Sequence, residues 1–307
     1  MSPGNQTLKE FILVGFSQNR HISLLFFAAL FIIYILTIFG NGFLICAVFI
    51  SPKLHTSMYF FLCNLSFLDL CFSSSSVPKM FLDAISRTRT VSVFSCVVQM
   101  NIGLFLGGTE GLLLAVMAYD RYIAICIPLY YVIIMNYNIC RNIAVTMWLG
   151  SFFISVGPTI LKPLIFCTEN QLDHFVCEIL ALLKIACGNL TFYKLRLFIV
   201  SLFVLLLPFV FIVVSYILII SSILKIHSNE GRSKAFSTCA SHLIVVFMFY
   251  GTTITMYMGQ TKNLSSMLKY ISLIYGVITP VVNPLIYSLR NNEVKEALVK
   301  IVTKLSV

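Results

Sequence analysis

The chain has 307 residues, of which 59% are hydrophobic and only 10% are charged. A soluble domain has about 45–50% apolar and about 25% charged residues, so a chain this poor in charge cannot cover its apolar surface for water. The mean hydropathy of +0.96 agrees with this reading. Composition therefore excludes a soluble globular protein and indicates an integral membrane protein.

The formal net charge of +10 does not indicate nucleic-acid binding. The 21 Lys and Arg residues are scattered in twos and threes between apolar runs, without a basic stripe or a basic domain. In a membrane protein such residues at helix ends contact phospholipid headgroups, so membrane lipid is an expected partner and nucleic acid is not.

Stretches free of Asp, Glu, Lys and Arg mark the candidate membrane spans, because about 20 apolar residues cross the hydrocarbon and a charge at its centre is costly. Asp69 and Glu110 are internal acids in two of the spans. Such long, uniformly apolar runs fit helices and not barrel strands, so we predict an all-α membrane protein, a single domain over 1–307 with seven transmembrane helices. The predicted spans are 21–52, 57–78, 90–119, 142–161, 197–224, 235–261 and 270–289.

Residues after the seventh span predict one further helix. Residues 291–307 place five apolar side chains on one helical face and three lysines off it, which is typical of a short amphipathic helix on the inner leaflet. A frayed tail is the alternative interpretation.

The orientation in the membrane follows from features other than the basic residues. Ten Lys and Arg residues lie on the C-terminal side of the membrane and eleven on the other side, so their count does not decide which side is cytoplasmic. Asn5 begins a glycosylation sequon, and four of the ten cysteines lie on the N-terminal side, where they allow three pairings. Both features suit an oxidising compartment, so we expect residues 1–21 outside a plasma membrane and residues 291–307 in the cytoplasm.

Two motifs at membrane boundaries favour a signalling role. Asp120 and Arg121, at the end of the third span, can close as an ion pair or open so that the arginine reaches a partner. On its own, the pair fits two snorkelling charges equally well. Pro284, near the end of the seventh span, frees a backbone carbonyl and kinks the helix into a hinge.

Together these motifs resemble those of the rhodopsin-like G-protein-coupled receptors, and further motifs resemble the olfactory receptor branch. Ser57 stands where that family usually has proline, Tyr130 where histidine is usual, and Val282 where leucine is more common. The matching segments are FILVGF at 11–16, GN at 40–41, KLHTSMYFFL at 53–62, LSFLD at 65–69, PKM at 78–80, MAYDRYIAIC at 117–126, SY at 215–216, KAFSTCASHL at 234–243, FYG at 249–251 and PLIYSLRN at 284–291.

The resemblance implies an odorant receptor, not an enzyme, that binds a small volatile molecule and activates a heterotrimeric G protein of the stimulatory olfactory type. A rhodopsin-like receptor for an endogenous small molecule outside olfactory tissue is the alternative. A channel or transporter predicts a pore-lining polar row or paired broken helices, and an intramembrane enzyme predicts a nucleophile with a base. The sequence shows neither pattern.

The resemblance also implies roles for individual residues. It pairs Cys96 with Cys177 and leaves Cys167 for Cys187. Arg121 is expected to hold Asp120 in the inactive state and to turn toward the G protein when the sixth span moves outward. The expected switch residues are Asp120, Arg121, Tyr122, Tyr216, His242 and Tyr287.

A polar cluster inside the membrane is expected from Asn41, Asp69, Glu110 and Asn283, which the resemblance places close together. Two facing acids either share a proton or hold a cation, and we favour a sodium ion at Asp69 and Glu110. A hydrogen-bonded cluster that only stabilises the bundle is the alternative. No other metal or cofactor is expected.

The ligand pocket is expected in the outer half of the bundle, under the long loop. Residues 103–109 offer no carboxylate for an amine, and residues 197–261 offer no outer Lys or Arg for an acid, although Lys262 and Lys269 near the mouth could reach inward. We therefore expect a neutral odorant, such as an alcohol, aldehyde, ketone or ester. Helical spacing predicts as its lining Leu104, Phe105, Gly108, Ser201, Val204, Tyr250, Ile254, Tyr257 and Gly276.

Overall fold

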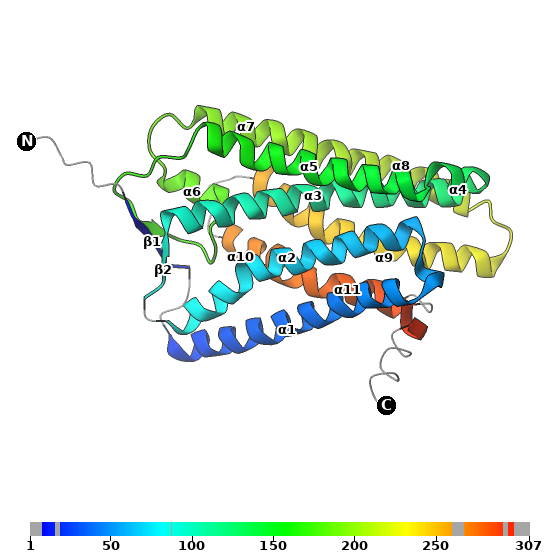
Figure 1. Ribbon diagram of the computed structural model, residues 1–307, viewed down its shortest axis with the longest axis horizontal. Coiled ribbons are helices and arrows are strands. Elements are labelled where there is room, and N and C mark those ends of the chain that lie inside the picture. The colour runs from blue at the N-terminus through cyan, green and yellow to red at the C-terminus, as the bar shows by residue number, and fades with distance from the viewer. Residues whose placement is uncertain (1–7, 16–18, 87, 260–266, 291–293, 298–307) are drawn as a thin grey trace, which may run out of the picture.

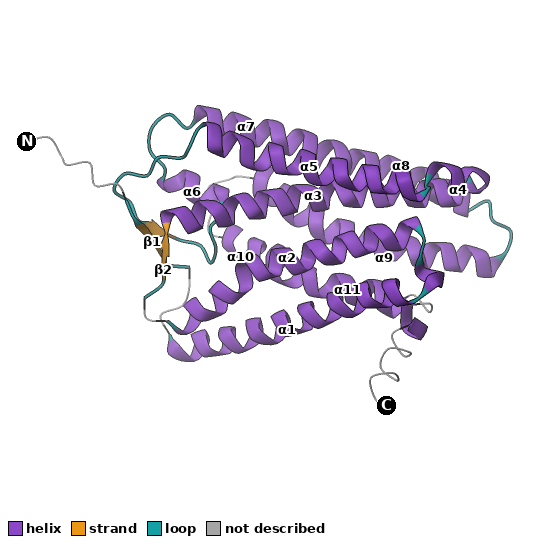
Figure 2. Cartoon of the chain, in the orientation of Figure 1, coloured by secondary structure: helices purple, strands orange, loops and turns teal. Residues whose placement is uncertain are grey.

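The computed structural model describes residues 8–15, 19–86, 88–259, 267–290 and 294–297. Within these residues, seven helices are long and apolar enough to cross a membrane. They run lengthwise beside one another (Figure 1), and strands are confined to one end of the bundle (Figure 2). The predicted fold class, an all-α bundle of seven transmembrane helices, is confirmed.

Two of the spans contain a π-helical turn between α-helical parts. These turns, η3 and η4, are flanked by α7 and α8 in the fifth span and by α10 and α11 in the seventh. The spans are α1 (Arg20–Ile50), α2 (Ser57–Ile85), α3 (Val93–Cys126), α5 (Tyr137–Leu161), α7–η3–α8 (Thr191–Ser201, Leu202–Leu206 and Leu207–Ile223), α9 (Asn229–Met258) and α10–η4–α11 (Leu268–Leu273, Ile274–Ile278 and Thr279–Arg290).

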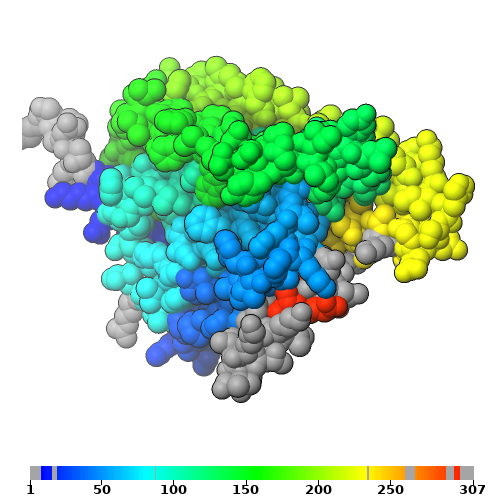
Figure 3. Space-filling model, turned by 45° about the vertical axis from the view of Figure 1, so that its right-hand side comes forward, coloured from blue at the N-terminus to red at the C-terminus, as the bar shows by residue number. Residues whose placement is uncertain are grey.

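Several predicted span ends were wrong because freedom from charge marks the hydrocarbon, whereas helices extend beyond it. The second helix continues through Pro78 to Ile85, and the fifth span begins at Thr191. The sixth helix begins at Asn229, where the Ser228 hydroxyl accepts a hydrogen bond from a first-turn amide at 3.3 Å. The start of α9 and the end of α8 consequently project beyond the neighbouring helices (Figures 1 and 3).

A small three-stranded sheet closes one end of the bundle and was not predicted. Its strands are β1 (Glu10–Leu13), β2 (Thr90–Ser92) and β3 (Gln171–Leu172), in the order β2-β1-β3. The first pair is antiparallel and the second is parallel. Strands of two to four residues are too short to show a two-residue period, and the predicted start of the third span fell on β2.

The two ends of the bundle are named here by their short elements. The sheet end carries the three strands and α6 (Ile179–Ile185), and the α4 end carries η1 (Pro52–Leu54), η2 (Pro128–Tyr130) and α4 (Tyr131–Ile134) (Figure 1). The larger core cluster is centred on α3, where Leu113 and Leu114 are fully buried. The smaller cluster lies at the sheet end and includes Phe11 of β1.

Large apolar side chains also cover the outer surface of the bundle. Phe247 in α9 is 78% exposed and Leu25 in α1 is 72% exposed. An apolar exterior over helices of this length is what a hydrocarbon environment requires, and it explains the composition from which the fold was predicted.

Prolines interrupt the hydrogen-bond ladders of three spans at positions where polar side chains from other spans approach. Pro78, Pro158 and Pro284 lie inside α2, α5 and α11, and each lacks the N–H that would bind the carbonyl four residues earlier. The kink that follows also opens the turn around that carbonyl.

Each of these opened turns receives a side-chain donor from another helix. Asn41 Nδ2 of α1 donates to the freed Pro280 carbonyl at 2.9 Å. Gln99 Nε2 of α3 donates at 3.0 Å to the Ser75 carbonyl, one residue after the carbonyl that Pro78 leaves free. Arg196 Nη2 of α7 donates to the carbonyls of Ile154 and Ser155 at 2.8 and 2.7 Å.

Some predicted features fall outside the described residues. These are the sequon at Asn5, Lys262, and all of the predicted amphipathic helix 291–307 except residues 294–297, which are helical. In that short piece Val294 and Ala297 are buried, as expected for one apolar helical face.

Candidate functional site

Two adjoining cavities lie inside the sheet end of the bundle, between α3, the fifth span, α9 and the seventh span. They share Gly103, Leu104, Tyr257 and Tyr275, and have volumes of about 630 and 460 Å³. We call the pair the sheet-end cavity.

Six of the nine predicted lining residues line this cavity. Its shape depends on the two π-helical turns, because Val204 belongs to η3 and Gly276 belongs to η4. The six residues are Leu104, Gly108, Ser201, Val204, Tyr257 and Gly276.

The other three predicted lining residues lie elsewhere. Phe105 packs edge-on against Trp148 and Phe152 of α5, with ring centroids 5.6 Å apart in each pair. Tyr250 is fully buried and donates its hydroxyl proton to the Gly111 carbonyl at 2.7 Å. Ile254 packs against the larger core cluster. One residue along a helix turns a side chain by about 100°, so spacing alone did not separate lining from packing positions.

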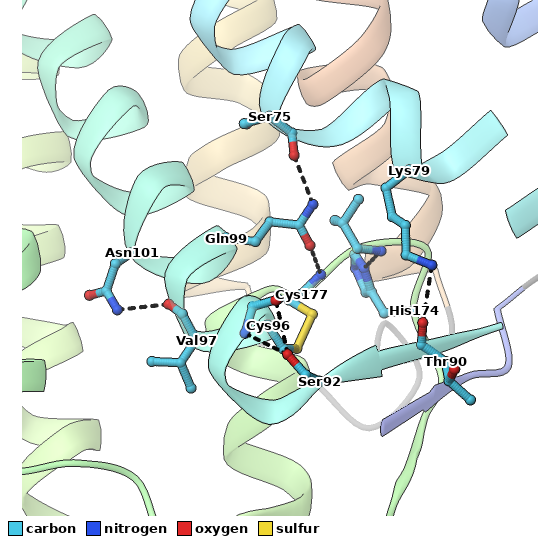
Figure 4. Close-up of a disulfide and its surroundings, with 12 residues drawn as sticks. Ser75, Lys79, Thr90, Ser92, Cys96, Val97, Gln99, Asn101, His174 and Cys177 are labelled. Atoms are coloured by element: carbon cyan, nitrogen blue, oxygen red, sulfur yellow. Dashed lines mark hydrogen bonds between the residues drawn. A yellow bond between two sulfur atoms is a disulfide. The ribbon is translucent and has the colours of Figure 1, made fainter. Parts of the chain in front are cut away.

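The long loop is fixed over the cavity by disulfides. Cys96 of α3 is bonded to Cys177, and Cys167 is bonded to Cys187, which are the pairings that the resemblance implies. Beside the first disulfide, Gln99 accepts a hydrogen bond from the Cys177 amide at 3.0 Å while it donates to Ser75 (Figure 4). One side chain therefore connects the loop to the kinked part of α2.

The loop brings a carboxylate to the cavity that the sequence interpretation missed. Glu178, next to Cys177, lines the cavity and accepts hydrogen bonds through Oε2 from the amides of Leu180 and Ala181, at 2.8 and 3.4 Å. Oε1 is buried and accepts no hydrogen bond from the described residues. The sequence interpretation looked for a carboxylate on the third span, whereas Glu178 belongs to the loop and is held beside the cavity by the neighbouring disulfide.

Burial raises the pKa of Glu178 to about 7, although its two amide donors and the nearby Tyr257 hydroxyl favour the charged form. Near neutral pH this carboxyl group therefore exists in both protonation states. It is the one charged side chain that lines the sheet-end cavity among the described residues.

A second set of contacts joins the loop to the seventh span. Asp173 forms an ion pair with Lys269 at 2.8 Å, and His174 Nε2 lies 3.2 Å from the Ser272 hydroxyl. Burial lowers the pKa of His174 to about 4, so its ring is neutral and accepts the Val176 amide proton through Nδ1. The ammonium group of Lys269 is thus already paired with the carboxylate of Asp173.

The predicted polar cluster lies in the middle of the bundle, in two parts. Asn283 Nδ2 donates to both oxygens of Asp69 at 3.2 and 3.0 Å. Asn41 binds the Pro280 carbonyl of the adjacent turn instead of an acid. Three buried acceptors, Oδ1 of both asparagines and Glu110 Oε1, accept no hydrogen bond from the described residues.

At the α4 end, the third span closes an ion pair on itself. Arg121 Nε donates to Asp120 Oδ2 at 3.1 Å, and its Nη2 contacts the same oxygen. Ser57 and Tyr131 donate to the other oxygen at 2.6 and 3.0 Å. Ser57, which departs from the family's proline, therefore has a hydrogen-bonding role in this chain.

The predicted switch residues surround a cavity of about 560 Å³ at this end. Asp120, Arg121, His242 and Tyr287 line it. Tyr216 lies behind His242, with its hydroxyl 2.7 Å from Nδ1, which gives His242 a partner that sequence reasoning had not found. Tyr122 does not line the cavity and packs against the larger core cluster.

Comparison with known proteins identifies the architecture. The model of the olfactory receptor family matches residues 30–305. The chain belongs to the olfactory receptor family. It is 49% identical to human olfactory receptor 13C9 over 302 residues, 95% of each chain, and 45% identical to mouse olfactory receptor 2C1, over 98% of this chain and 97% of that one.

Membership in this family settles the general class. The protein is a G-protein-coupled receptor with seven spans in the plasma membrane, and it is not an enzyme. The cavity at each end of the bundle is consistent with this class, since ligand and transducer act on opposite sides of the membrane.

Replacing Glu178 with Gln should change the pH dependence of stability. The ordinary pKa of the group is 4.5 and its folded value is about 7, so its stabilising contribution is present below pH 4.5 and is lost as the pH rises through 7. We expect the wild-type melting temperature to fall relative to that of Glu178→Gln between pH 4.5 and 7.5, as measured on purified receptor. His174 is present in both proteins, so its contribution to the pH dependence cancels in the comparison. Parallel curves over this range would show that Glu178 is not buried as described.

Proposed function

We propose that this olfactory receptor binds a small, neutral, volatile odorant in the sheet-end cavity and activates a stimulatory olfactory-type G protein at the α4 end. The observation that carries the proposal is an apolar cavity with a few hydroxyl groups, closed by a disulfide-bonded loop. Both disulfides lie at the sheet end, which supports an extracellular N-terminus and a cytoplasmic C-terminus.

The charges around the cavity favour a neutral ligand. A carboxylate would meet Glu178, and Lys269, which could have attracted it, is paired with Asp173. An amine would meet a carboxyl group that is already bound to two amides and whose neutral form is favoured by burial. Apolar burial, at about 25 cal/mol per Å², then supplies most of the affinity, with hydrogen bonds to Ser201 or Tyr257.

A screen of matched odorants tests this proposal. Alcohols, aldehydes, ketones, esters, acids and amines that share a carbon skeleton would be applied to cells expressing the receptor, with cyclic nucleotide as the readout. We expect responses to neutral members at modest affinity, because a small ligand has few atoms to bind with. A response confined to acids and lost in Lys269→Ala would contradict the proposal.

The ion pair at the α4 end supports a switch mechanism. Asp120 holds Arg121 while Ser57 and Tyr131 hold Asp120, so the arginine is paired within its own helix at the wall of the cavity that would receive the G protein. An agonist would shift the population toward the open state through its higher affinity for that state. Outward movement of α9, whose His242 contacts Tyr216 of α8, would release Arg121.

Arg121→Ala should keep ligand binding and lose signalling, because the ligand cavity and the switch lie at opposite ends of the bundle. Radioligand binding and cyclic nucleotide production would be measured at matched surface expression. Full signalling by the variant would remove Arg121 from the mechanism.

The central polar cluster is proposed to hold a sodium ion. Asp69, Glu110 and the side-chain oxygens of Asn41 and Asn283 offer hard oxygen donors, several of which accept no hydrogen bond from the described residues. A sodium ion bound there would balance one negative charge of the two acids inside the membrane.

Sodium should therefore stabilise the inactive receptor, and Glu110→Ala should abolish that effect. The agonist concentration for half-maximal response would be measured in membranes with sodium chloride and with choline chloride at equal ionic strength. Equal sodium dependence in wild type and variant would favour the alternative, a purely hydrogen-bonded cluster.

A further inference from the structure

A positive charge near the sheet end of the fifth span has no acidic partner. Arg196 lies in the second turn of α7 and is partly buried, and none of the ion pairs among the described residues includes it. Its Nη2 donates to the carbonyls of Ile154 and Ser155, while no hydrogen bond from Nε or Nη1 is formed to a described residue. Even partial removal of a guanidinium group from water costs free energy, and an approaching anion offsets that cost.

Arg196 lines a third cavity, which we call the α5 cleft. The cleft has a volume of about 510 Å³ and lies between α3, α5 and α7, the last two of which run side by side (Figure 1). It borders the sheet-end cavity through shared residues of α3 and the fifth span, but has its own wall on α5, which includes Ile154 and Ser155.

The α5 cleft has a polar and an apolar region. Leu104, Val200 and Val204 are apolar lining residues, whereas Arg196 is charged. Ser151, also on the lining, is 3% exposed, and its hydroxyl oxygen has no hydrogen-bond partner among the described residues. An unpaired buried hydroxyl and an unpaired guanidinium group in the same cleft call for a ligand with oxygen acceptors.

We propose that the α5 cleft binds an amphiphilic carboxylate, with the carboxylate on Arg196 and a single apolar chain along Leu104, Val200 and Val204. Guanidinium groups match carboxylates in geometry and charge, and such charge-assisted hydrogen bonds are about twice as strong as neutral ones. The site adjoins the sheet-end cavity and shares Leu104, Val200 and Val204 with it, whereas Arg196 and Ser151 line the α5 cleft alone.

Radiolabelled decanoate is a direct probe of the α5 cleft. Equilibrium binding would be measured on purified full-length receptor in nanodiscs, with decanol as the neutral competitor. We expect saturable decanoate binding that decanol displaces weakly, and a loss of affinity of about tenfold or more in Arg196→Gln, since a charged hydrogen-bonded pair contributes at least that much.

Lys194→Gln is the matched control, because Lys194 is an exposed cation two residues away and lies outside the cleft. It should bind decanoate as the wild type does. Ser151→Leu keeps Arg196 and fills the cleft with a larger side chain, so it should weaken binding even if Arg196→Gln fails to reach the membrane. Non-saturable binding, or equal affinity in wild type and either cleft variant, would overturn the proposal.

Two sources could supply the carboxylate, and two measurements separate them. Native mass spectrometry of receptor purified without added acid should detect a bound fatty acid if the membrane supplies it. A cyclic nucleotide response to added decanoate, absent in Arg196→Gln, would instead identify an acidic odorant. Direct binding of decanoate and its loss in Arg196→Gln are measured before decanol is added, so failure of the neutral-odorant proposal leaves these two results unaffected.

Discussion

Backbone polar groups buried in hydrocarbon must find partners within the protein, and this constraint explains where the polar residues of this receptor lie. Prolines at 78, 158 and 284 remove donors from three membrane-spanning helices. In each case a polar side chain from another helix reaches the opened turn, from Gln99, Arg196 and Asn41. These contacts tie α2 to α3, α5 to α7 and α1 to α11 at defined heights in the bundle.

The same constraint shapes the sheet-end cavity. Two further prolines, Pro208 and Pro280, follow the π-helical turns η3 and η4. At these two positions the π-helical turn takes the place of the side-chain donor that is found at the other three prolines. Such turns are frequent at functional sites because they redirect neighbouring side chains. Here they carry Val204 and Gly276 to the cavity wall. Gln99 adds a link between the kink of α2 and the disulfide-bonded loop that covers the cavity.

The sequence predicts the seven spans because the length of each apolar run between charged residues reflects the thickness of the hydrocarbon. It does not predict the sheet, because β3 has two residues and pairs with strands far away in the chain. The ion pair of Asp120 and Arg121 joins neighbouring residues and was predicted from its motif. The contribution of Ser57 to that pair was missed, since it depends on an approach between α2 and α3 across 63 residues of sequence.

The charges near the cavity show most clearly why sequence reasoning stopped short. Glu178 lies in a loop whose path is fixed by the disulfide to Cys96 and by other contacts distant in sequence, so no periodicity places it inside. Arg196 lies one residue before the charge-free stretch that was taken as the fifth span, and was therefore assigned to the loop. The helix begins five residues earlier, at Thr191, and brings this cation into the bundle.

A double-mutant cycle on Asn41 and Pro284 tests most directly whether side chains stabilise the carbonyls that prolines free. Asn41→Leu, Pro284→Ala and the double variant would be compared with wild type by thermal unfolding of purified receptor. Pro284→Ala restores the N–H at position 284 and gives the Pro280 carbonyl an intrahelical partner. Asn41→Leu should therefore lower the free energy of unfolding less in the Pro284→Ala background than in wild type, by a difference of at least about 1 kcal/mol. Effects that add within about 0.3–0.5 kcal/mol would contradict the account.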